Sequence, residues 1–200
     1  KNTFIRIPLG AHVVHLGLLL LLLGHLSTTV LVDRGDASHR ISLVKDELIL
    51  HEGMGFEFTD LIVESDGLEV GDGFIGVQID IYDMDGTTVG DRIGTVTPGT
   101  LRFDSQGIPR SEVATLTRLT GDIVFIFDGS QAGALMSSSN GGGLENIELV
   151  RVTVYDLPHS HLVWAGWVIM MGGMALVAFA GTKKATLSSE QEMKSRPEEE

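Results

Sequence analysis

The sequence predicts a membrane protein in which two transmembrane α-helices flank an extracytoplasmic all-β domain with a sandwich-like or barrel-like core. Two runs of 26 residues, 7–32 and 157–182, contain no Asp, Glu, Lys or Arg, and about 18 such apolar residues are enough to cross a bilayer as a helix. The segment between them has short runs of Val, Ile and Phe separated by Gly, Asp and Pro, which is typical of strands. The acidity is concentrated in this segment: 33–156 holds 22 acidic and 8 basic residues, against a net charge of −13 for the chain.

The first span, 9–32, contains the leucine-rich run LGLLLLLLGHL. A cleaved signal peptide is the alternative interpretation, because Lys1 and Arg6 precede the apolar run. We favour a retained transmembrane helix, since 26 uncharged residues exceed the roughly 7–15 of a signal-peptide core and no A-x-A cleavage site follows. The sequence begins with Lys1 rather than Met, so the rear part of a longer chain and a complete chain both stay open as interpretations.

The second span, 158–181, carries Trp164 and Trp167 near its start, where aromatic side chains favour a membrane interface. It also contains small residues that allow helices to approach closely in a membrane: Gly166, Gly172, Gly173, Ala175, Ala178 and Gly181. The polar tail 182–200 is expected to be disordered and cytoplasmic.

Lysine and arginine near the spans predict the orientation. Lys1 and Arg6 precede the first span, and four basic residues follow the second, so both termini are expected in the cytoplasm. The domain 33–157 is then extracytoplasmic, and the protein is a multi-pass protein of the cytoplasmic membrane.

Within 33–157 the apolar runs predict eight strands. Val150, Val152 and Val154 alternate with polar residues and should share one buried face. Asp85-Gly86 predicts a hairpin turn between two of the strands. The predicted strands are Ile41–Leu50, Phe56–Ser65, Phe74–Tyr82, Thr87–Val96, Thr100–Phe103, Glu112–Leu119, Asp122–Phe127 and Leu144–Tyr155.

Composition and motifs exclude several functions. The chain has no cysteine, which removes disulfides, thiolate metal sites and cysteine nucleophiles, and a net charge of −13 argues against nucleic-acid binding. The acidic, lysine-poor composition is typical of proteins from concentrated salt, although an ordinary acidic extracellular domain would look the same. GDGFIG, 71–76, matches a dinucleotide fingerprint, but a strand pattern follows it, so we interpret it as a glycine-rich turn.

A partial calcium-loop pattern at Asp83, Asp85 and Gly86 puts Ile81 and Arg92 where acidic ligands belong, so a hairpin with solvated carboxylates is the better interpretation. With no serine elbow, P-loop or HExxH in the sequence, nothing indicates a catalytic centre of the chain's own.

Three of the seven histidines lie in the first span: His12, His15 and His25. An imidazole in hydrocarbon usually faces a partner or a functional pocket. His12 and His15 are three residues apart and share one helix face, and His25 lies about 15 Å further along the axis. Ligation and hydrogen bonding to neighbouring helices both remain open for the first two. His39, His51, His159 and His161 are expected in water or at the interface, without a ligand role.

Three segments, in order, resemble the C-terminal part of the CcmF family of cytochrome c haem lyases: GAHVVHLGLLLLLLG, SEVATLTRLTGDIVFIF and VYDLPHSHLVWAGWVIMMGGMALVAFAG. In that family a helix with a His-Leu-Gly element, here His15-Leu16-Gly17, leads into an extracytoplasmic β-domain. A Pro-led helix with Trp and a Gly-Gly pair closes the unit. The resemblance covers about residues 10–181, and the family's Trp-rich haem-handling loop has no counterpart in it.

The resemblance implies a subunit or portion of a haem lyase that helps hold haem b and positions apocytochrome c for covalent haem attachment. The implied partners are the remainder of a CcmF-like protein or a split subunit, a haem chaperone, subunits presenting apocytochrome c, and membrane lipid, with no nucleic acid. The alternative is a membrane-tethered β-domain that binds a protein partner and has no haem role.

The resemblance also implies the site residues. His15 falls on the His-Leu-Gly element and is expected to be an axial ligand to haem iron, with Gly17 leaving room for the porphyrin face. His12, one turn away, is the second haem-binding candidate. The other axial ligand should come from a helix outside this chain, so the haem is expected to be shared.

Overall fold

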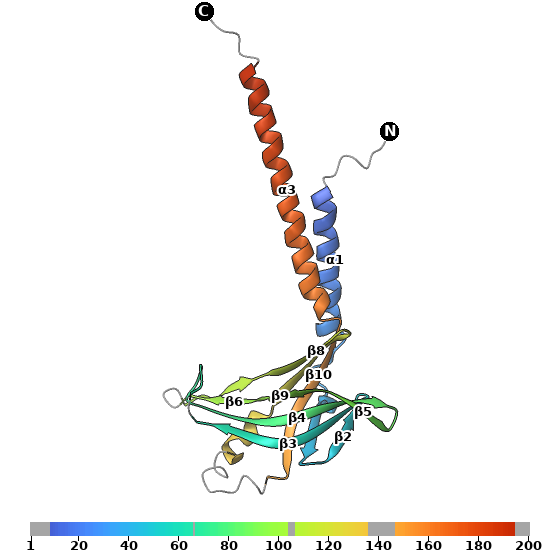
Figure 1. Ribbon diagram of the computed structural model, residues 1–200, viewed down its shortest axis with the longest axis vertical. Helices are drawn as coiled ribbons and strands as arrows, with labels where there is room; N and C mark the ends of the chain where they lie inside the picture. The colour runs from blue at the N-terminus through green and yellow to red at the C-terminus, as the bar shows by residue number, and fades with distance from the viewer. Residues whose placement is uncertain (1–8, 66, 104–106, 136–146, 195–200) are drawn as a thin grey trace, which may run out of the picture. The chain divides into compact units, whose positions relative to one another are not determined.

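The computed structural model describes residues 9–65, 67–103, 107–135 and 147–194. The chain divides into two compact units (Figure 1). One contains the two ends, Lys1–Leu31 and Pro158–Glu200, and the other is the segment Val32–Leu157. Each unit is described by itself below.

The first unit is a pair of helices, α1 (Leu9–Thr29) and α3 (His161–Lys194). The helices run antiparallel, because Gly10 faces Gly173 while Gly24 faces Val163. Leu9–Thr29 and His161–Phe179 are each long and apolar enough to cross a membrane. Most of their large apolar side chains are exposed, as in Leu19 and Trp164. The prediction of two long apolar helices at the ends is confirmed, and their insertion in a membrane stays a prediction.

α3 continues beyond its apolar part to Lys194, whereas the sequence analysis predicted disorder from residue 182. The reason is local: Ala, Leu, Glu, Gln, Met and Lys dominate 185–194, and all of them are good helix formers. The polar composition of 182–194 led to the prediction of disorder, but polar residues with high helix propensity can still form a helix. The rest of the predicted tail, 195–200, lies outside the described residues.

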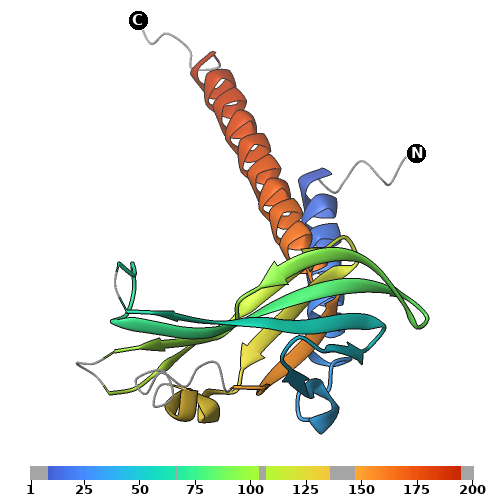
Figure 2. The ribbon, with the colours of Figure 1, turned by 60° about the horizontal axis from the view of Figure 1, so that its bottom comes forward.

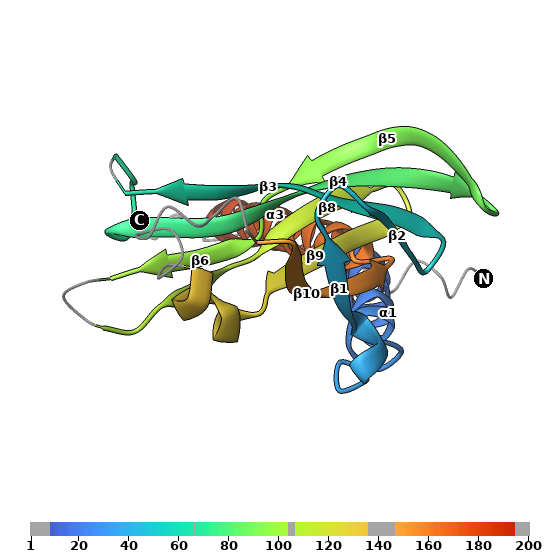
Figure 3. The same ribbon diagram turned by 90° about the horizontal axis from the view of Figure 1, so that it is seen from below.

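The second unit contains two antiparallel sheets (Figure 3). The smaller sheet has the order β1-β10-β9-β8, and the larger has the order β2-β3-β4-β6-β7, with β5 also paired to β4. The smaller sheet consists of β1 (Arg40–Val44), β8 (Ala114–Arg118), β9 (Gly121–Phe127) and β10 (Leu149–Pro158). The larger consists of β2 (Leu48–His51), β3 (Met54–Glu64), β4 (Gly73–Asp85), β5 (Thr88–Val96), β6 (Gly99–Arg102) and β7 (Arg110–Glu112). The described part of the unit also contains two short 3-10 helices, η2 (Ala37–His39) and η3 (Gly129–Gln131), and helical residues at 132–135.

One hydrophobic core lies between the two sheets. Phe56 of the larger sheet meets Phe125 of the smaller edge to face, with ring centroids 5.7 Å apart, an arrangement that aromatic pairs favour. Val150, Val152 and Val154 are all buried, which confirms that they share an inward face. The predicted all-β architecture is therefore present as a sandwich.

Two predicted strands are each divided between the sheets. The run predicted as one strand, Ile41–Leu50, forms β1 in the smaller sheet and β2 in the larger. The chain turns at Asp46, which has a φ of 57° and donates its backbone N–H to the Phe58 carbonyl at 2.9 Å. The run Glu112–Leu119 is likewise divided at Val113 into the end of β7 and β8. Apolar content alone does not show where a strand leaves one sheet for the other.

Both predicted turns are present. β4 and β5 pair up to Asp85 and Thr88 and form the long hairpin seen in Figure 2, and Gly86 has the positive φ, 62°, that such a turn requires. Gly71, in the run GDGFIG, has a φ of 84°, and strand β4 begins at Gly73. The run is therefore a glycine-rich turn that enters a strand, as predicted.

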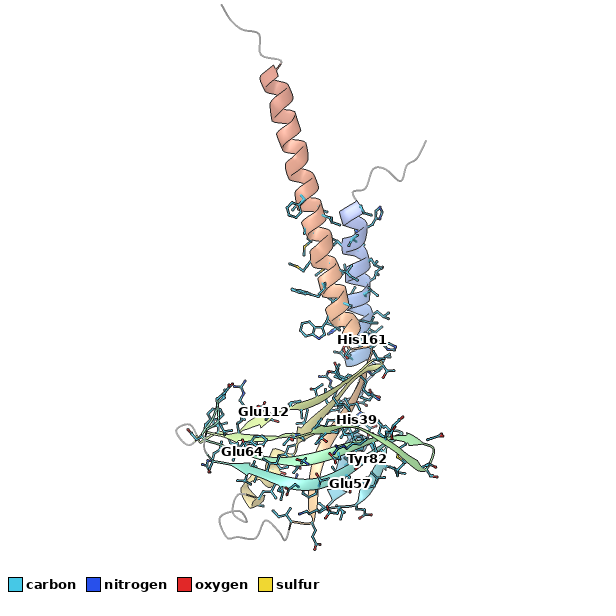
Figure 4. The ribbon with its side chains drawn as sticks, in the orientation of Figure 1. His39, Glu57, Glu64, Tyr82, Glu112 and His161 are labelled. Carbon is cyan, nitrogen blue, oxygen red and sulfur yellow. The ribbon has the colours of Figure 1, made fainter. Side chains whose placement is uncertain are left out.

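A polar network covers the face of β4 opposite the core. Asp80 is 7% exposed and accepts hydrogen bonds from Arg92 Nη1 at 2.9 Å and from the Thr95 hydroxyl. Beside it, the Tyr82 hydroxyl donates to Glu57 Oε2 at 2.9 Å (Figure 4). Burial raises the pKa of the Asp80 carboxyl, but the hydrogen bonds from Thr95 and Arg92 and the Arg92 charge outweigh it and leave the pKa below its usual value.

We expect Asp80→Asn to lower the free energy of unfolding at pH 7 by about 1 kcal/mol, because it removes one buried, charge-assisted set of hydrogen bonds. Since the folded-state pKa is lowered, this stabilisation is fully present above pH about 4 and is lost as the pH falls through the folded-state pKa. Denaturant unfolding of the full chain in detergent, at pH 7 and at successively lower pH, measures the difference.

Asp85→Asn is the matched control, because Asp85 is exposed at the tip of the β4–β5 hairpin. It should leave the free energy of unfolding unchanged at every pH. Equal effects of the two substitutions, or a loss at Asp80 that grows toward acid, would contradict the role assigned to the Asp80 network.

Candidate functional site

Glycine lines the contact between α1 and α3. Gly10, Gly17 and Gly24 are buried in α1 at seven-residue intervals, and Gly166 and Gly173 are buried in α3 at the same interval. A Cβ atom added at Gly173 would lie 2.6 Å from the Val14 backbone nitrogen, and one added at Gly10 would lie 2.7 Å from the Gly173 carbonyl oxygen. Any larger residue at these positions would push the two backbones apart.

This contact corrects one expectation. Gly17 was predicted to leave room for a porphyrin face, but an added Cβ there would collide with Met170 and with the Gly166 carbonyl oxygen. The space beside Gly17 is therefore filled by α3. Sequence analysis identified the small residues of the second span but not their separate roles: Gly172, next to Gly173, has nothing within 4 Å of its added Cβ.

The close approach of the helices leaves an apolar groove of about 380 Å³ along one side of the pair. Ala11, Val14 and His15 line it from α1, and Met174, Val177 and Ala178 line it from α3. The imidazole of His15 is the only titratable group among these six residues. The structure thus gives His15 a different setting from the other two histidines of α1.

The His15 ring is oriented by its own helix. Its Nδ1 lies 2.7 Å from the Ala11 carbonyl oxygen, one turn back. A carbonyl only accepts, so this hydrogen bond requires the proton on Nδ1, and in the neutral ring Nε2 then carries the lone pair. A backbone carbonyl bonded to one ring nitrogen is the usual support for a histidine that binds a metal through the other nitrogen. The ring is exposed at the surface of the helix pair.

His12 and His25 do not join this site. Both side chains are exposed on α1, and neither lines the groove. His161, the first residue of α3, precedes Met174 by thirteen residues, which is about 20 Å of helix. The histidine of α3 therefore does not lie level with His15. The sequence analysis missed Met174 and Val177 as lining residues, because only the helix register brings them beside His15.

The end of α1 has polar side chains that are satisfied within the helix. The hydroxyls of Ser27 and Thr28 donate to the carbonyls of Leu23 and Gly24, each at 3.0 Å. Ser and Thr side chains in helices often bond to the carbonyl four residues back in this way. Ser27 and Thr28 therefore do not compete with His15 as a polar feature of the pair.

Comparison with known proteins gives a likeness of fold to a solved structure. No protein-family model matches the sequence, and no curated protein matches it. Among solved structures, the chain is similar to Cytochrome c Heme Lyase CcmF, with a TM-score of 0.53 over 84% of this chain at 14% sequence identity. The chain shares its fold with the part of that protein that it matches.

The likeness to CcmF confirms the predicted structural relationship in its coarse form. The matched region is 24% of the CcmF chain, so this chain spans about a quarter of that protein. Its match to the C-terminal part of CcmF in particular stays a prediction.

Gly173→Ala should destabilise the helix pair, because its new methyl group meets the Val14 backbone. Gly172→Ala is the matched control on the adjacent residue, and it should be neutral or slightly stabilising, since Ala is favoured over Gly in a helix by about 0.5–1 kcal/mol. Both tryptophans of the chain, Trp164 and Trp167, lie in α3, so their fluorescence during thermal unfolding in detergent follows this unit.

The expected result is a lower midpoint for Gly173→Ala and an equal or higher midpoint for Gly172→Ala. The reverse order, or two equal shifts, would show that the backbone contact at Gly173 does not hold the helices together.

Proposed function

We propose that this chain takes part in cytochrome c maturation, as a membrane subunit or portion of a CcmF-like haem lyase that helps hold haem b and positions apocytochrome c. The observation that carries the proposal is the structural likeness to Cytochrome c Heme Lyase CcmF over 84% of the chain. The setting of His15 supports it independently, because an oriented imidazole beside an apolar groove suits a flat apolar cofactor with a ligated metal.

His15 is the proposed axial ligand. When bound, haem would supply an iron that an imidazole can ligate, and the described residues could hold one side of it. Nδ1 is held by the Ala11 carbonyl, so Nε2 points its lone pair away from the backbone, and the small side chains of Ala11 and Ala178 leave the groove open. His12 lacks this setting and is the second candidate for haem contact, through a propionate or a polar neighbour.

The second axial ligand would come from a helix outside this chain, because His161 is about 20 Å along α3 from the groove. The haem would then be shared with the remainder of a CcmF-like protein or with a separate subunit. A haem chaperone and the subunits that present apocytochrome c are the further proposed partners.

The β-domain, 33–157, would be extracytoplasmic and act as a positioning module without catalysis of its own. The spans 9–32 and 158–181 would cross the cytoplasmic membrane, and both termini would be cytoplasmic. The acidity of the β-domain supports a location in water, because the 22 acidic side chains in 33–156 are stable only where they are hydrated.

His15→Ala, in the assembled complex, should lower haem content and mature cytochrome c. Loss of even an outer partner of a metal ligand weakens such sites about 10–100-fold, so loss of the ligand itself should cost at least as much. Haem is measured by the Soret absorbance per mole of purified complex, and imidazole added to the His15→Ala complex should restore part of it.

His12→Ala and His25→Ala are the controls, since both side chains are exposed on the same helix and lie outside the groove. They should retain more haem than His15→Ala. Full haem occupancy in His15→Ala would show that His15 is not the iron ligand. A wild-type complex without haem would favour the alternative function, a membrane-tethered β-domain that binds only a protein partner.

The orientation is tested with single cysteines, because the chain contains none. Asp85→Cys, at the exposed hairpin tip, should react with a membrane-impermeant maleimide on intact spheroplasts. Ser188→Cys, beyond the second apolar span, should react only after permeabilisation. The opposite pattern would place the β-domain in the cytoplasm.

A further inference from the structure

The larger sheet of the β-domain carries a groove of about 640 Å³, here called the acidic groove. It lies on the sheet face opposite the core, because Phe74 lines it while the next residue, Ile75, belongs to the core. One row of residues in register crosses the sheet along it, from β3 through β4 and β6 to β7: Glu64, Phe74, Leu101 and Arg110. All four line the groove.

Phe74 gives the acidic groove an apolar floor that is held in place. A Cβ atom added at Gly76 or at Gly99 would lie 2.5 Å from a ring carbon of Phe74, so the ring lies against two backbone positions that have no side chain. The ring is half-buried there, and Leu101 continues the floor on the next strand. This floor suits an apolar side chain of a ligand.

Carboxylates outnumber cations around this floor. Glu64 and Glu69 line the groove at the β3 end, and Glu112 lines it with Arg110 at the β7 end; Figure 4 labels Glu64 and Glu112. All four side chains are exposed. None of the ion pairs among the described residues includes any of the three glutamates. Three carboxylates and one guanidinium leave an excess of negative charge, which favours a cationic ligand.

The shape of the acidic groove suits an extended polypeptide. The row from Glu64 to Arg110 crosses three strand spacings of about 4.8 Å each, so it is about 14 Å long, and four or five extended residues at about 3.3 Å each span that length. The lining is open to solvent, because Val70 and Val113 are 54% and 47% exposed. A small-molecule site would enclose most of its ligand, and this groove does not.

We propose that the acidic groove binds a short extended segment of a partner polypeptide that carries an apolar residue next to lysine or arginine. The apolar side chain would lie on Phe74 and Leu101, and a basic side chain would reach the Glu64 and Glu69 carboxylates. The inference rests on the proposed positioning role of the β-domain for its choice of a polypeptide, and it needs neither haem nor His15.

The charge of the whole domain would help such a partner to arrive. The segment 33–156 has 22 acidic and 8 basic residues, so its field attracts a basic chain before contact. Salt screens this attraction, because the Debye length falls from about 30 Å at 0.01 M to about 8 Å at 0.15 M ionic strength. Binding should therefore weaken as the salt concentration rises.

The test is fluorescence anisotropy with the full chain in a non-ionic detergent at low salt. The probe is fluorescein-labelled Gly-Ser-Lys-Leu-Lys-Ser-Gly, and empty micelles give the background. We expect saturable binding below about 1 mM. A peptide with Glu in place of both Lys should not bind, and a peptide with Ser in place of Leu should bind more weakly.

Glu64→Gln/Glu69→Gln should weaken binding of the Lys-Leu-Lys peptide about fivefold, because two exposed charge pairs are lost. Asp85→Asn/Asp91→Asn is the matched control: it removes the same charge from two exposed residues at the β4–β5 hairpin, outside the groove. It should bind the peptide as the wild type does. Because all four side chains are exposed, both double variants should unfold at the wild-type midpoint.

No binding by the folded wild-type chain would overturn the proposal, and so would equal weakening in the two double variants, which would show attraction to the acidic domain as a whole. Equal binding of the Ser-containing peptide would show that the apolar floor is not used. Hexylamine that displaces the peptide at equal concentration would assign the groove to a small apolar cation. A dimer that dissociates in Glu64→Gln/Glu69→Gln would assign it to a second copy of this chain. Each of these results would overturn the proposal, and none would bear on the haem content measured for His15→Ala.

Discussion

The contact between the backbones of α1 and α3 is the constraint on which the helical unit depends. Glycine at every seventh position, Gly10, Gly17 and Gly24, lets α3 approach until an added Cβ would touch its main chain. In a membrane, where apolar side chains gain nothing by leaving lipid, such close packing is what holds helices together. In this register Gly10 lies against Gly173 and Gly17 lies against Gly166.

The proposed haem site follows from that register. The register of α1 against α3 decides which residues of the two helices line one groove, and it sets His15 with Met174 and Val177. Had the pair slid by one turn, the Ala11 carbonyl would still orient the ring, but the groove beside it would have a different lining.

The β-domain obeys a separate constraint, the burial of one core between two sheets. The chain must change sheets at defined points, and it does so at Asp46 and Val113. The first crossing lies between His39 and His51 and brings them to one carboxylate, Glu52. The change of sheet thus closes the core and also brings His39 and His51 toward the same carboxylate.

The sequence by itself determined the features that depend on local pattern: two apolar helices, an acidic all-β segment, the Asp85-Gly86 hairpin, the inward face of Val150, Val152 and Val154, and a likeness to the CcmF fold. These follow from helix or strand periodicity and from turn chemistry, which involve neighbours in sequence. Tertiary structure alone decided that Gly17 faces α3, that Ile41–Leu50 is divided between two sheets, and that His39 and His51 meet at Glu52. Each depends on which distant segment lies opposite, and that is set by packing of backbone against backbone and sheet against sheet.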